Sequence, residues 1–370
     1  MSALSRKEDT FSRAKEADRP TEVRIGRTAG KQLPGRSPLR GRSRGWRVIC
    51  RSPAPSLCGL HSRAWSINYL PMRAYLRLIR PADWIKNTFV FAALVFGAKV
   101  TDPEAVKLSL AAFIAFCMAS SSAYVFNDLL DRERDKHHPI KKNRPIASGQ
   151  VSPIEAVVLI VALLAGAVGI SLTLLPREFV FVVGMYLVLN IAYSTFLKHR
   201  MLLDVITIAI LFVLRAIAGA VAIGVPISEW LLICTFMLCL FLGFGKRRCE
   251  IATIAESGGG TGHHRPTLVR YTPDLLNHLL STSAGIAIIT FLLYTLDPRS
   301  SSVFMKEKHR LMYTLPLVVY GIYRYAMLVE LGKASGPTDL ILKDKPFLAT
   351  LVLWGVCAVL ILYGPAILPF

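Results

Sequence analysis

The chain has 370 residues, 53% of them hydrophobic, and its 44 Lys and Arg outnumber its 24 Asp and Glu, which gives a formal charge of +20. So apolar a composition excludes a disordered chain and is unusual for a soluble globular protein. The charge alone would suit a nucleic-acid-binding protein, but such proteins do not usually carry long uncharged runs. A multi-pass membrane protein with basic loops on one side accounts for both properties.

The N-terminal segment differs from the rest of the chain. Residues 1–66 hold 15 Lys and Arg and only 5 Asp and Glu, and they are rich in Ser, Gly and Pro. Because no apolar run there is long enough to form a core, we expect residues 1–71 to be a disordered basic extension. Met72 opens a far more protein-like segment, so the extension is expected to be dispensable, and whether it is translated stays open. The alternative is a basic arm that contacts anionic lipid or nucleic acid.

Residues 72–370 are expected to form a single membrane-embedded catalytic domain of the all-α class. A spanning helix needs about 20 mostly apolar residues, and about nine segments approach that length. The first of them is short and is expected to extend upstream. The nine predicted spans are Asn87–Val100, Ala105–Phe126, Ile154–Leu175, Phe179–Phe196, Leu202–Ile223, Trp230–Gly245, Leu276–Leu296, Leu311–Leu331 and Phe347–Leu368.

The basic residues gather in every second loop. With nine spans and a cytoplasmic N-terminus, the loops around residues 127–153, 197–201, 246–275 and 332–346 all fall on one side. Positive charge favours the cytoplasmic side of a membrane. We therefore expect a multi-pass protein of the cell membrane whose polar site faces the cytoplasm.

The strongest local motif follows the second predicted span. Asp128, Asp131 and Asp135 recur at spacings of three and four residues, so on a helix they share one face. Clustered carboxylates repel one another unless a cation lies between them, and oxygen ligands with open positions suit Mg²⁺ together with substrate phosphates. Asn127 adds an amide beside them. The three aspartates are therefore candidate Mg²⁺ ligands and catalytic residues, and the alternative is a solvated helix end with Asp–Arg pairs.

Basic residues follow the acidic motif closely. Fixed cations beside an Mg²⁺ site are what a diphosphate leaving group requires, because they neutralise the charge that the metal does not. His137 and His138 are interpreted as solvated loop residues. The candidate substrate-binding cations of this stretch are Arg134, Lys141, Lys142 and Arg144.

Polar residues also interrupt the later spans. Asp204 and Arg215 lie in one predicted span, where an ionisable group is costly unless it is paired. They are therefore candidate substrate ligands, with a buried structural pair or a tie between helices as the alternative. Tyr193 and Lys198 precede them at the membrane boundary and are added to the candidates.

A third cluster ends the sixth predicted span. Lys246, Arg247 and Glu250 are able to share a helical face, with the two cations directed at a phosphate. The alternative is ordinary anchoring by positive charge at the membrane surface. Near the first span, Lys86 and Asn87 supply another cation and another amide on the same side.

Taken in order, these clusters resemble the UbiA superfamily of intramembrane prenyltransferases. Its NDxxDxxxD motif matches Asn127 to Asp135, but the second Asp-rich motif of ordinary members is replaced by GKRRCE at 245–250. That replacement, with RPADWIKN, YSTFLK, YGIYRY and DLILKDKP, is similar to one branch, the decaprenyl-phosphate phosphoribosyltransferases. The resemblance covers the chain from about Met72 onward.

The resemblance implies a reaction and assigns roles. Phosphoribosyl diphosphate would enter from the cytoplasm and a polyprenyl phosphate from the membrane, and Mg²⁺ on the three aspartates would bind the diphosphate. Lys246 and Arg247 would hold the 5-phosphate or the lipid phosphate, with Glu250 orienting them or binding ribose hydroxyls. No general base is needed, because a phosphate monoester is already a nucleophile at neutral pH; the work is positioning and electrostatics.

Two other functions remain open on the sequence. A conventional UbiA aromatic prenyltransferase would use a lipid that carries the diphosphate, and the missing second Asp motif argues against it. A transporter or lipid-binding protein would show Gly- or Pro-broken spans in corresponding halves, which the sequence does not have. No nucleic-acid partner is expected, and a homo-oligomer is neither predicted nor excluded.

Overall fold

The computed structural model describes residues 69–138, 141–226, 228–256, 271–298, 305–331 and 344–367. All of them belong to one compact unit of the chain. Within these ranges every regular element is a helix, as the all-α prediction requires, and there is no strand. Of the basic extension predicted over 1–71, residues 1–68 lie outside the described residues.

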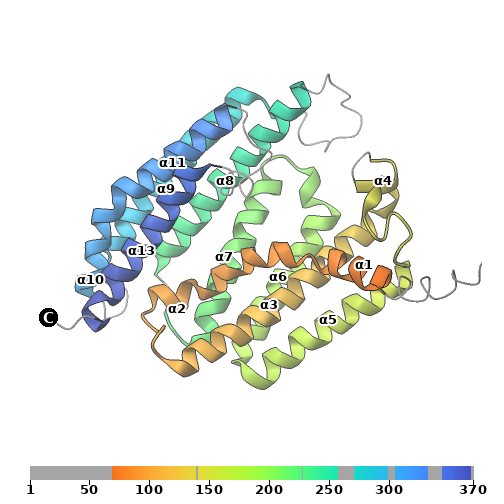
Figure 1. The fold of residues 1–370 in the computed structure, drawn as a ribbon, viewed down its shortest axis with the longest axis horizontal. Coiled ribbons are helices and arrows are strands. Elements are labelled where there is room, and N and C mark those ends of the chain that lie inside the picture. The colour runs from red at the N-terminus through yellow and green to blue at the C-terminus, as the bar shows by residue number, and fades with distance from the viewer. Residues whose placement is uncertain are drawn as a thin grey trace, which may run out of the picture. The chain divides into compact units, whose positions relative to one another are not determined.

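Eight of the described helices are long and apolar enough to cross a membrane. Short helices connect or precede them (Figure 1). The long helices are α3 (Pro103–Leu130), α5 (Pro153–Leu174), α6 (Arg177–Thr195), α7 (Leu203–Ile223), α8 (Glu229–Glu256), α9 (Pro273–Leu296), α11 (Leu315–Glu330) and α13 (Lys345–Ile367). α11 reaches spanning length together with the turns before it, as the continuous helical stretch Lys308–Glu330. The short ones are α1 (Tyr69–Ile79), η2 (Pro81–Phe91), α2 (Ala92–Phe96), α4 (Arg132–Lys136), η3 (Lys141–Asn143), η4 (Leu197–His199), α10 (Met305–Arg310) and η7 (Leu311–Thr314).

The first predicted span differs from the prediction. Residues 69–96 form three consecutive helices, α1, η2 and α2, instead of one continuous helix, so a ninth span is not confirmed. The break falls at Arg80, which adopts a left-handed conformation (φ 50°, ψ 63°). Pro81 follows it, and a proline disfavours the right-handed helical conformation at the preceding residue. The segment does extend upstream of Asn87, as expected.

Local sequence signals explain where several spans begin. α3, α5 and α9 each start with a capping side chain followed by proline, namely Asp102, Ser152 and Thr272. Such side chains accept hydrogen bonds from the free backbone N–H groups of the first turn, and proline at the first position has no N–H to satisfy. Ser152 also forms a reciprocal capping box with Glu155.

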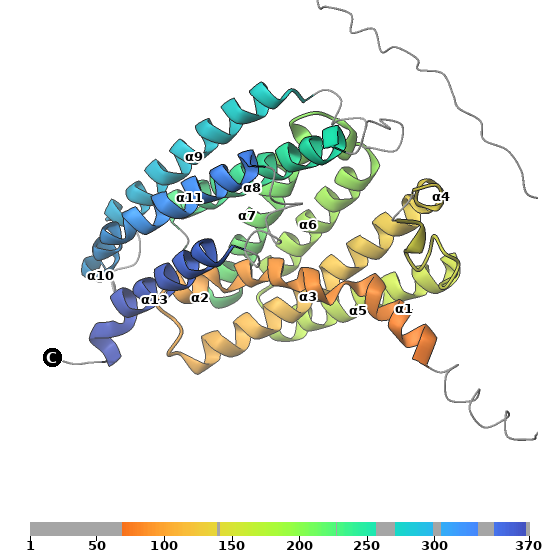
Figure 2. The same ribbon diagram turned by 45° about the horizontal axis from the view of Figure 1, so that its top comes forward.

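The spans pack as neighbours in a bundle, with α3 beside α5, α7 beside both α6 and α8, and α8 beside α9 (Figures 1 and 2). α3 and α7 are its most enclosed members, and α5 leaves most of its apolar side chains exposed, as expected of a helix that faces lipid. Small residues fill the contacts of α3 and α7, such as Ala112, Ala119 and Ala218. Close approach of this kind is typical of membrane helices.

Gly219 is the closest of these approaches. A Cβ atom placed on it would lie 1.8 Å from the Val90 carbonyl oxygen of η2, so α7 and η2 touch backbone to backbone.

We expect Gly219→Ala to displace η2 and to destabilise the protein by about 1–3 kcal/mol, the usual cost of overpacking. Gly184→Ala in α6 is the matched control, because a Cβ atom there meets nothing within 4 Å and alanine favours the helix. Thermal unfolding of both variants in detergent checks the prediction. Equal stability of the two would contradict the close contact.

Candidate active site at the polar end of the bundle

The C-terminal ends of α3, α6 and α8 and the N-terminal end of α7 carry most of the buried ion pairs, and we call this the polar end. Asp128, in the last turn of α3, is its first element and is almost completely buried. Arg80 donates to both of its oxygens through Nη2, at 2.7 and 2.9 Å. Arg144 donates to its Oδ1 at 2.8 Å. Asp128 is therefore held by two guanidinium groups, one from the segment before α3 and one from the segment after it.

Arg144 joins two of the predicted aspartates. Its Nη1 also donates to Oδ2 of the buried Asp135 at 2.8 Å, so both carboxylates converge on one cationic group. Burial raises the pKa of Asp135 above its ordinary value, and the nearby charge of Arg144 opposes that rise. The two carboxylates do not share the face of one helix, because Asp128 ends α3 and Asp135 lies on the separate helix α4; Arg144 brings them together.

Asp131 has a different partner. α3 ends at Leu130, and Asp131 forms its C-terminal cap before α4 begins. Lys198 of η4 donates to both Asp131 oxygens at 2.8 Å and to the Asn127 side-chain oxygen at 3.3 Å. Lys198 is itself buried. The packing of η4 against the end of α3 therefore places its ammonium group beside Asp131.

Within the described ranges, no three His, Cys, Asp or Glu side chains are gathered as a ready metal site. The three-aspartate Mg²⁺ site therefore stays a prediction. The geometry that bears on it is the convergence of Asp128 and Asp135 on Arg144, because two carboxylates that share one cation are the oxygen donors that Mg²⁺ takes. The residues present fit a divalent cation at that place.

Arg80 is a site residue that the sequence reasoning did not select. Its left-handed backbone, which for a residue other than glycine costs roughly 1–2 kcal/mol, directs the side chain onto Asp128 and places the guanidinium 5.3 Å from the centre of the Tyr124 ring. The available signal was the Arg-Pro dipeptide at 80–81, since a proline restricts the residue before it.

Arg215 lies deeper in α7 and belongs to a fully bonded network. It donates to the Asn87 side-chain oxygen at 2.8 Å, to the Leu211 carbonyl at 2.7 Å and to the Tyr186 hydroxyl at 2.9 Å. Asn87 in turn donates to Ser120 of α3 at 3.0 Å. These contacts tie η2, α3, α6 and α7 together. They correspond to the structural alternative for Arg215, although its partners are neutral groups and not Asp204.

Asp204 pairs instead with Arg247 of α8. The Nε of Arg247 lies 3.1 Å from Oδ2 of Asp204, and both side chains are almost completely buried. Arg247 also pairs with Glu250 through Nη1. The Tyr271 hydroxyl donates to Oδ1 of Asp204 at 3.0 Å. Arg247 was predicted to bind a substrate phosphate. In the structure its guanidinium group pairs with the carboxylates of Asp204 and Glu250, because the start of α7 faces the end of α8.

The other predicted residues lie at or near the polar end. Lys246 is exposed beside the buried Arg247, and Lys142 is exposed on η3. Lys86 pairs with Asp83 on η2, and Arg134 on α4 lies 3.4 Å from the His199 ring. Lys141 and Tyr193 are half-buried. The candidate site therefore combines buried ion pairs with several cationic side chains that are accessible to solvent.

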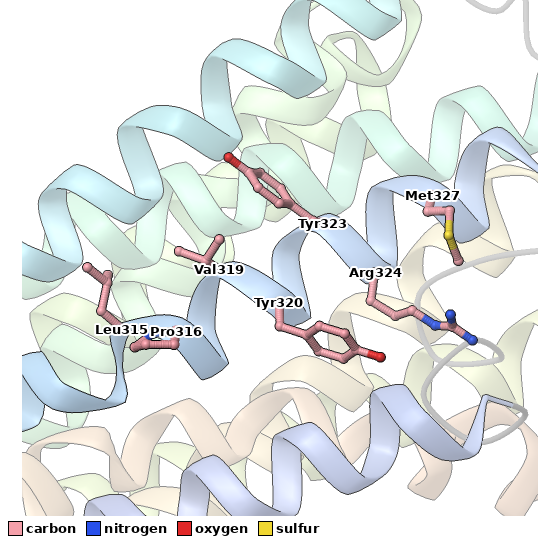
Figure 3. A pocket seen from close by; sticks show the side chains of 7 residues that line it. All are labelled: Leu315, Pro316, Val319, Tyr320, Tyr323, Arg324 and Met327. Atoms are coloured by element: carbon pink, nitrogen blue, oxygen red, sulfur yellow. The ribbon is translucent and has the colours of Figure 1, made fainter.

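An apolar groove of about 740 Å³ runs along α11, apart from these clusters. Figure 3 shows its lining, which includes Tyr320, Tyr323 and Arg324. Arg324 forms a two-point ion pair with Asp344, at 3.2 and 2.9 Å, which neutralises it. The groove suits a hydrocarbon chain better than a phosphate.

Comparison with known proteins identifies the architecture. The model of the UbiA prenyltransferase family matches residues 88–343, which include the Asp motif, Arg215 and the Asp204–Arg247 pair. The chain belongs to the UbiA prenyltransferase family. Because eight helices within its described residues are apolar and long enough to cross a membrane, it is a multi-pass membrane protein.

The curated relatives of this UbiA protein include the decaprenyl-phosphate phosphoribosyltransferase of Corynebacterium glutamicum, 31% identical over 291 residues, which cover 78% of this chain and 86% of the relative. The enzyme of the same name from Mycobacterium tuberculosis is 32% identical over 289 residues, 75% of this chain and 91% of that one. A solved UbiA homologue from Archaeoglobus fulgidus, bound to GPP and Mg²⁺, superposes with a TM-score of 0.59 at 20% identity and covers 80% of this chain and all of that one. It shows that the fold is shared.

Proposed function

We propose that residues 72–370 transfer the 5-phosphoribosyl group of phosphoribosyl diphosphate to a polyprenyl phosphate, such as decaprenyl phosphate, and release diphosphate. The observation that carries the proposal is the meeting of three carboxylates with Arg80, Arg144 and Lys198 at one end of a membrane bundle. A polyphosphate with its metal needs both kinds of charge. The names of the relatives supply the sugar and the lipid.

The reaction places few demands on proton transfer. The bond between C1 of ribose and the diphosphate oxygen breaks with its electron pair on the leaving group, and an ionised oxygen of the lipid phosphate forms the new bond to C1. Because that oxygen carries no proton, no side chain has to remove one. The protein acts by holding both phosphates near C1 and by stabilising charge on the leaving group.

The residues of the polar end divide this work. Bound Mg²⁺, held by Asp128 and Asp135 and joined by Asp131, would supply a charge that neutralises the departing diphosphate. Arg80, Arg144 and Lys198 are the cations nearest to these carboxylates and contribute the remaining positive charge. Lys141, Lys142 and Lys246, which are at least partly accessible, are assigned to the 5-phosphate and the lipid phosphate.

Orientation and lipid access belong to the same proposal. The polar end is expected to face the cytoplasm, where phosphoribosyl diphosphate is soluble, because basic residues concentrate there. The polyprenyl chain stays in the membrane and reaches the site from the side. The role in making a lipid-linked precursor of cell-envelope arabinan follows from the resemblance to the branch.

The test is a transfer assay on the purified full chain. The protein is incubated with Mg²⁺, phosphoribosyl diphosphate labelled in the ribose, and polyprenyl phosphates of several lengths. We expect label to enter the lipid phase only when metal, donor and lipid phosphate are all present. Chelation with EDTA is the matched control and should abolish the transfer.

An absence of labelled lipid with every acceptor would contradict the proposal. A parallel reaction with a polyprenyl diphosphate and an aromatic acceptor separates it from ordinary prenyl transfer. The replacement of the second Asp-rich motif by Gly245–Glu250, with Arg247 buried against Asp204, predicts no product in that reaction.

A further inference from the structure

We infer that Tyr271 is a positioning residue that fixes Lys198 of η4 and Asp204 of α7 in their places at the polar end. The inference rests on the proposed function, since it concerns the donor site described above. Tyr271 lies just before α9 and is buried against α7 and α8. None of the roles assigned above includes it, and its residue type in a polar loop gave no signal in the sequence.

The contacts of its hydroxyl carry the argument. The oxygen accepts a hydrogen bond from the Leu202 backbone N–H at 2.8 Å and donates to Asp204 Oδ1 at 3.0 Å. One phenol thus fixes the main chain immediately before α7 and the first buried carboxylate within it. Burial, and then the charge of Asp204, raise the pKa of Tyr271, so its hydroxyl keeps the proton that it donates.

Leu202 needs such a restraint. Its backbone angles are φ 67° and ψ −46°, a region that side-chain-bearing residues adopt rarely and at a cost. Strained backbone persists only where its surroundings enforce it. The Tyr271 hydroxyl is the side-chain partner of the Leu202 N–H, so we attribute the enforcement to it.

The strained corner determines where Lys198 lies. η4 ends at His199, three residues before Leu202, and Lys198 on η4 reaches both oxygens of Asp131. If the corner relaxed, η4 would shift relative to α3 and Lys198 would leave Asp131. On the other side of Tyr271, Asp204 holds Arg247. Tyr271 is therefore the link between the Asp131–Lys198 pair and the Asp204–Arg247 pair.

The first test is Tyr271→Phe, which deletes the hydroxyl and keeps the ring in the core. We expect the affinity for phosphoribosyl diphosphate in the presence of Mg²⁺ to fall about tenfold, the effect of one lost hydrogen bond, with kcat changed less than KM. The matched control is Tyr325→Phe, because Tyr325 lies in the same hydrophobic cluster and its hydroxyl donates to the backbone carbonyl of Leu242, away from the ion pairs. Its affinity should equal that of the unmodified protein.

A double-mutant cycle separates positioning from general weakening of the fold. Because Tyr271 acts through Lys198, the variant that combines Tyr271→Phe with Lys198→Gln should bind phosphoribosyl diphosphate no more weakly than Lys198→Gln alone. Binding is measured by calorimetry on the full chain in detergent, so that an inactive variant still gives a value. Additive losses would overturn the inference.

A rescue provides a second, independent outcome. Glycine adopts positive φ without strain, so Leu202→Gly should restore most of the affinity that Tyr271→Phe removes, and it gives a variant to measure if Tyr271→Phe alone does not fold. No rescue would also overturn the inference. If the unmodified protein neither binds phosphoribosyl diphosphate nor transfers its ribosyl group, the proposed function fails instead, whatever the variants show.

Discussion

Asp128→Asn is expected to lower the transfer rate at least about 100-fold. Changing a residue that only supports a metal ligand usually costs about 10- to 100-fold, and the loss of a ligand itself should cost more. The substitution removes the charge on which Arg80 and Arg144 converge. The protein should still fold, because both guanidinium groups are about a quarter exposed and are able to turn to water. Raising the Mg²⁺ concentration should recover little activity, since the lost ligand is not replaced.

The matched control is Glu133→Gln on the neighbouring helix α4. Glu133 is exposed and pairs with Arg132 and Lys136 on the same short stretch, so its neutralisation should leave transfer unchanged. Both variants are assayed for labelled lipid over a range of Mg²⁺ concentrations. Near-normal turnover in Asp128→Asn would remove this aspartate from the active site, and an equal loss in both variants would point to a general effect of charge.

Arg247→Met is expected to have the largest effect on stability, a loss of about 3–5 kcal/mol. It leaves Asp204, which is fully buried, without its cation, and an uncompensated buried charge is costly. Adding Asp204→Asn should recover much of the loss, because the double variant no longer buries that charge. The adjacent Lys246→Met is the control: Lys246 is exposed, and surface changes usually stay within about 0.5 kcal/mol.

Unfolding of the variants in the same detergent checks this second prediction. A single Arg247→Met variant as stable as the unmodified protein would mean that Asp204 is not held in the fold by its ion pair. A double variant no more stable than the single one would show that packing, and not charge, accounts for the loss.

The sequence predicted the elements whose signals are local. The long apolar runs predict the spans, and Asp128 and Asp135, which are close in sequence, both bind Arg144, although they lie on two helices instead of one. The break at Arg80 was not predicted, because a proline marks a probable boundary without specifying a left-handed residue. That break separates α1 from η2.

The pairings could not be predicted, because they depend on how helices distant in sequence face one another. The sequence placed Asp204 and Arg215 in one span, but helix packing gives Asp204 to Arg247 and Arg215 to Asn87. Tyr271 was missed for the same reason: its partners are 69 and 67 residues away, and only the fold brings them together.

The matched charges of the polar end have a thermodynamic consequence. Asp128, Asp131 and Asp135 carry three negative charges, and Arg80, Arg144 and Lys198 balance them. A metal cation that binds the carboxylate oxygens leaves the guanidinium and ammonium groups without their partners. A phosphate that binds those cationic groups leaves the carboxylates without theirs. Either ion alone therefore binds at a penalty that the two together avoid. Metal and phosphate should each raise the affinity of the site for the other by the same factor. The site is therefore expected to bind the two ions cooperatively.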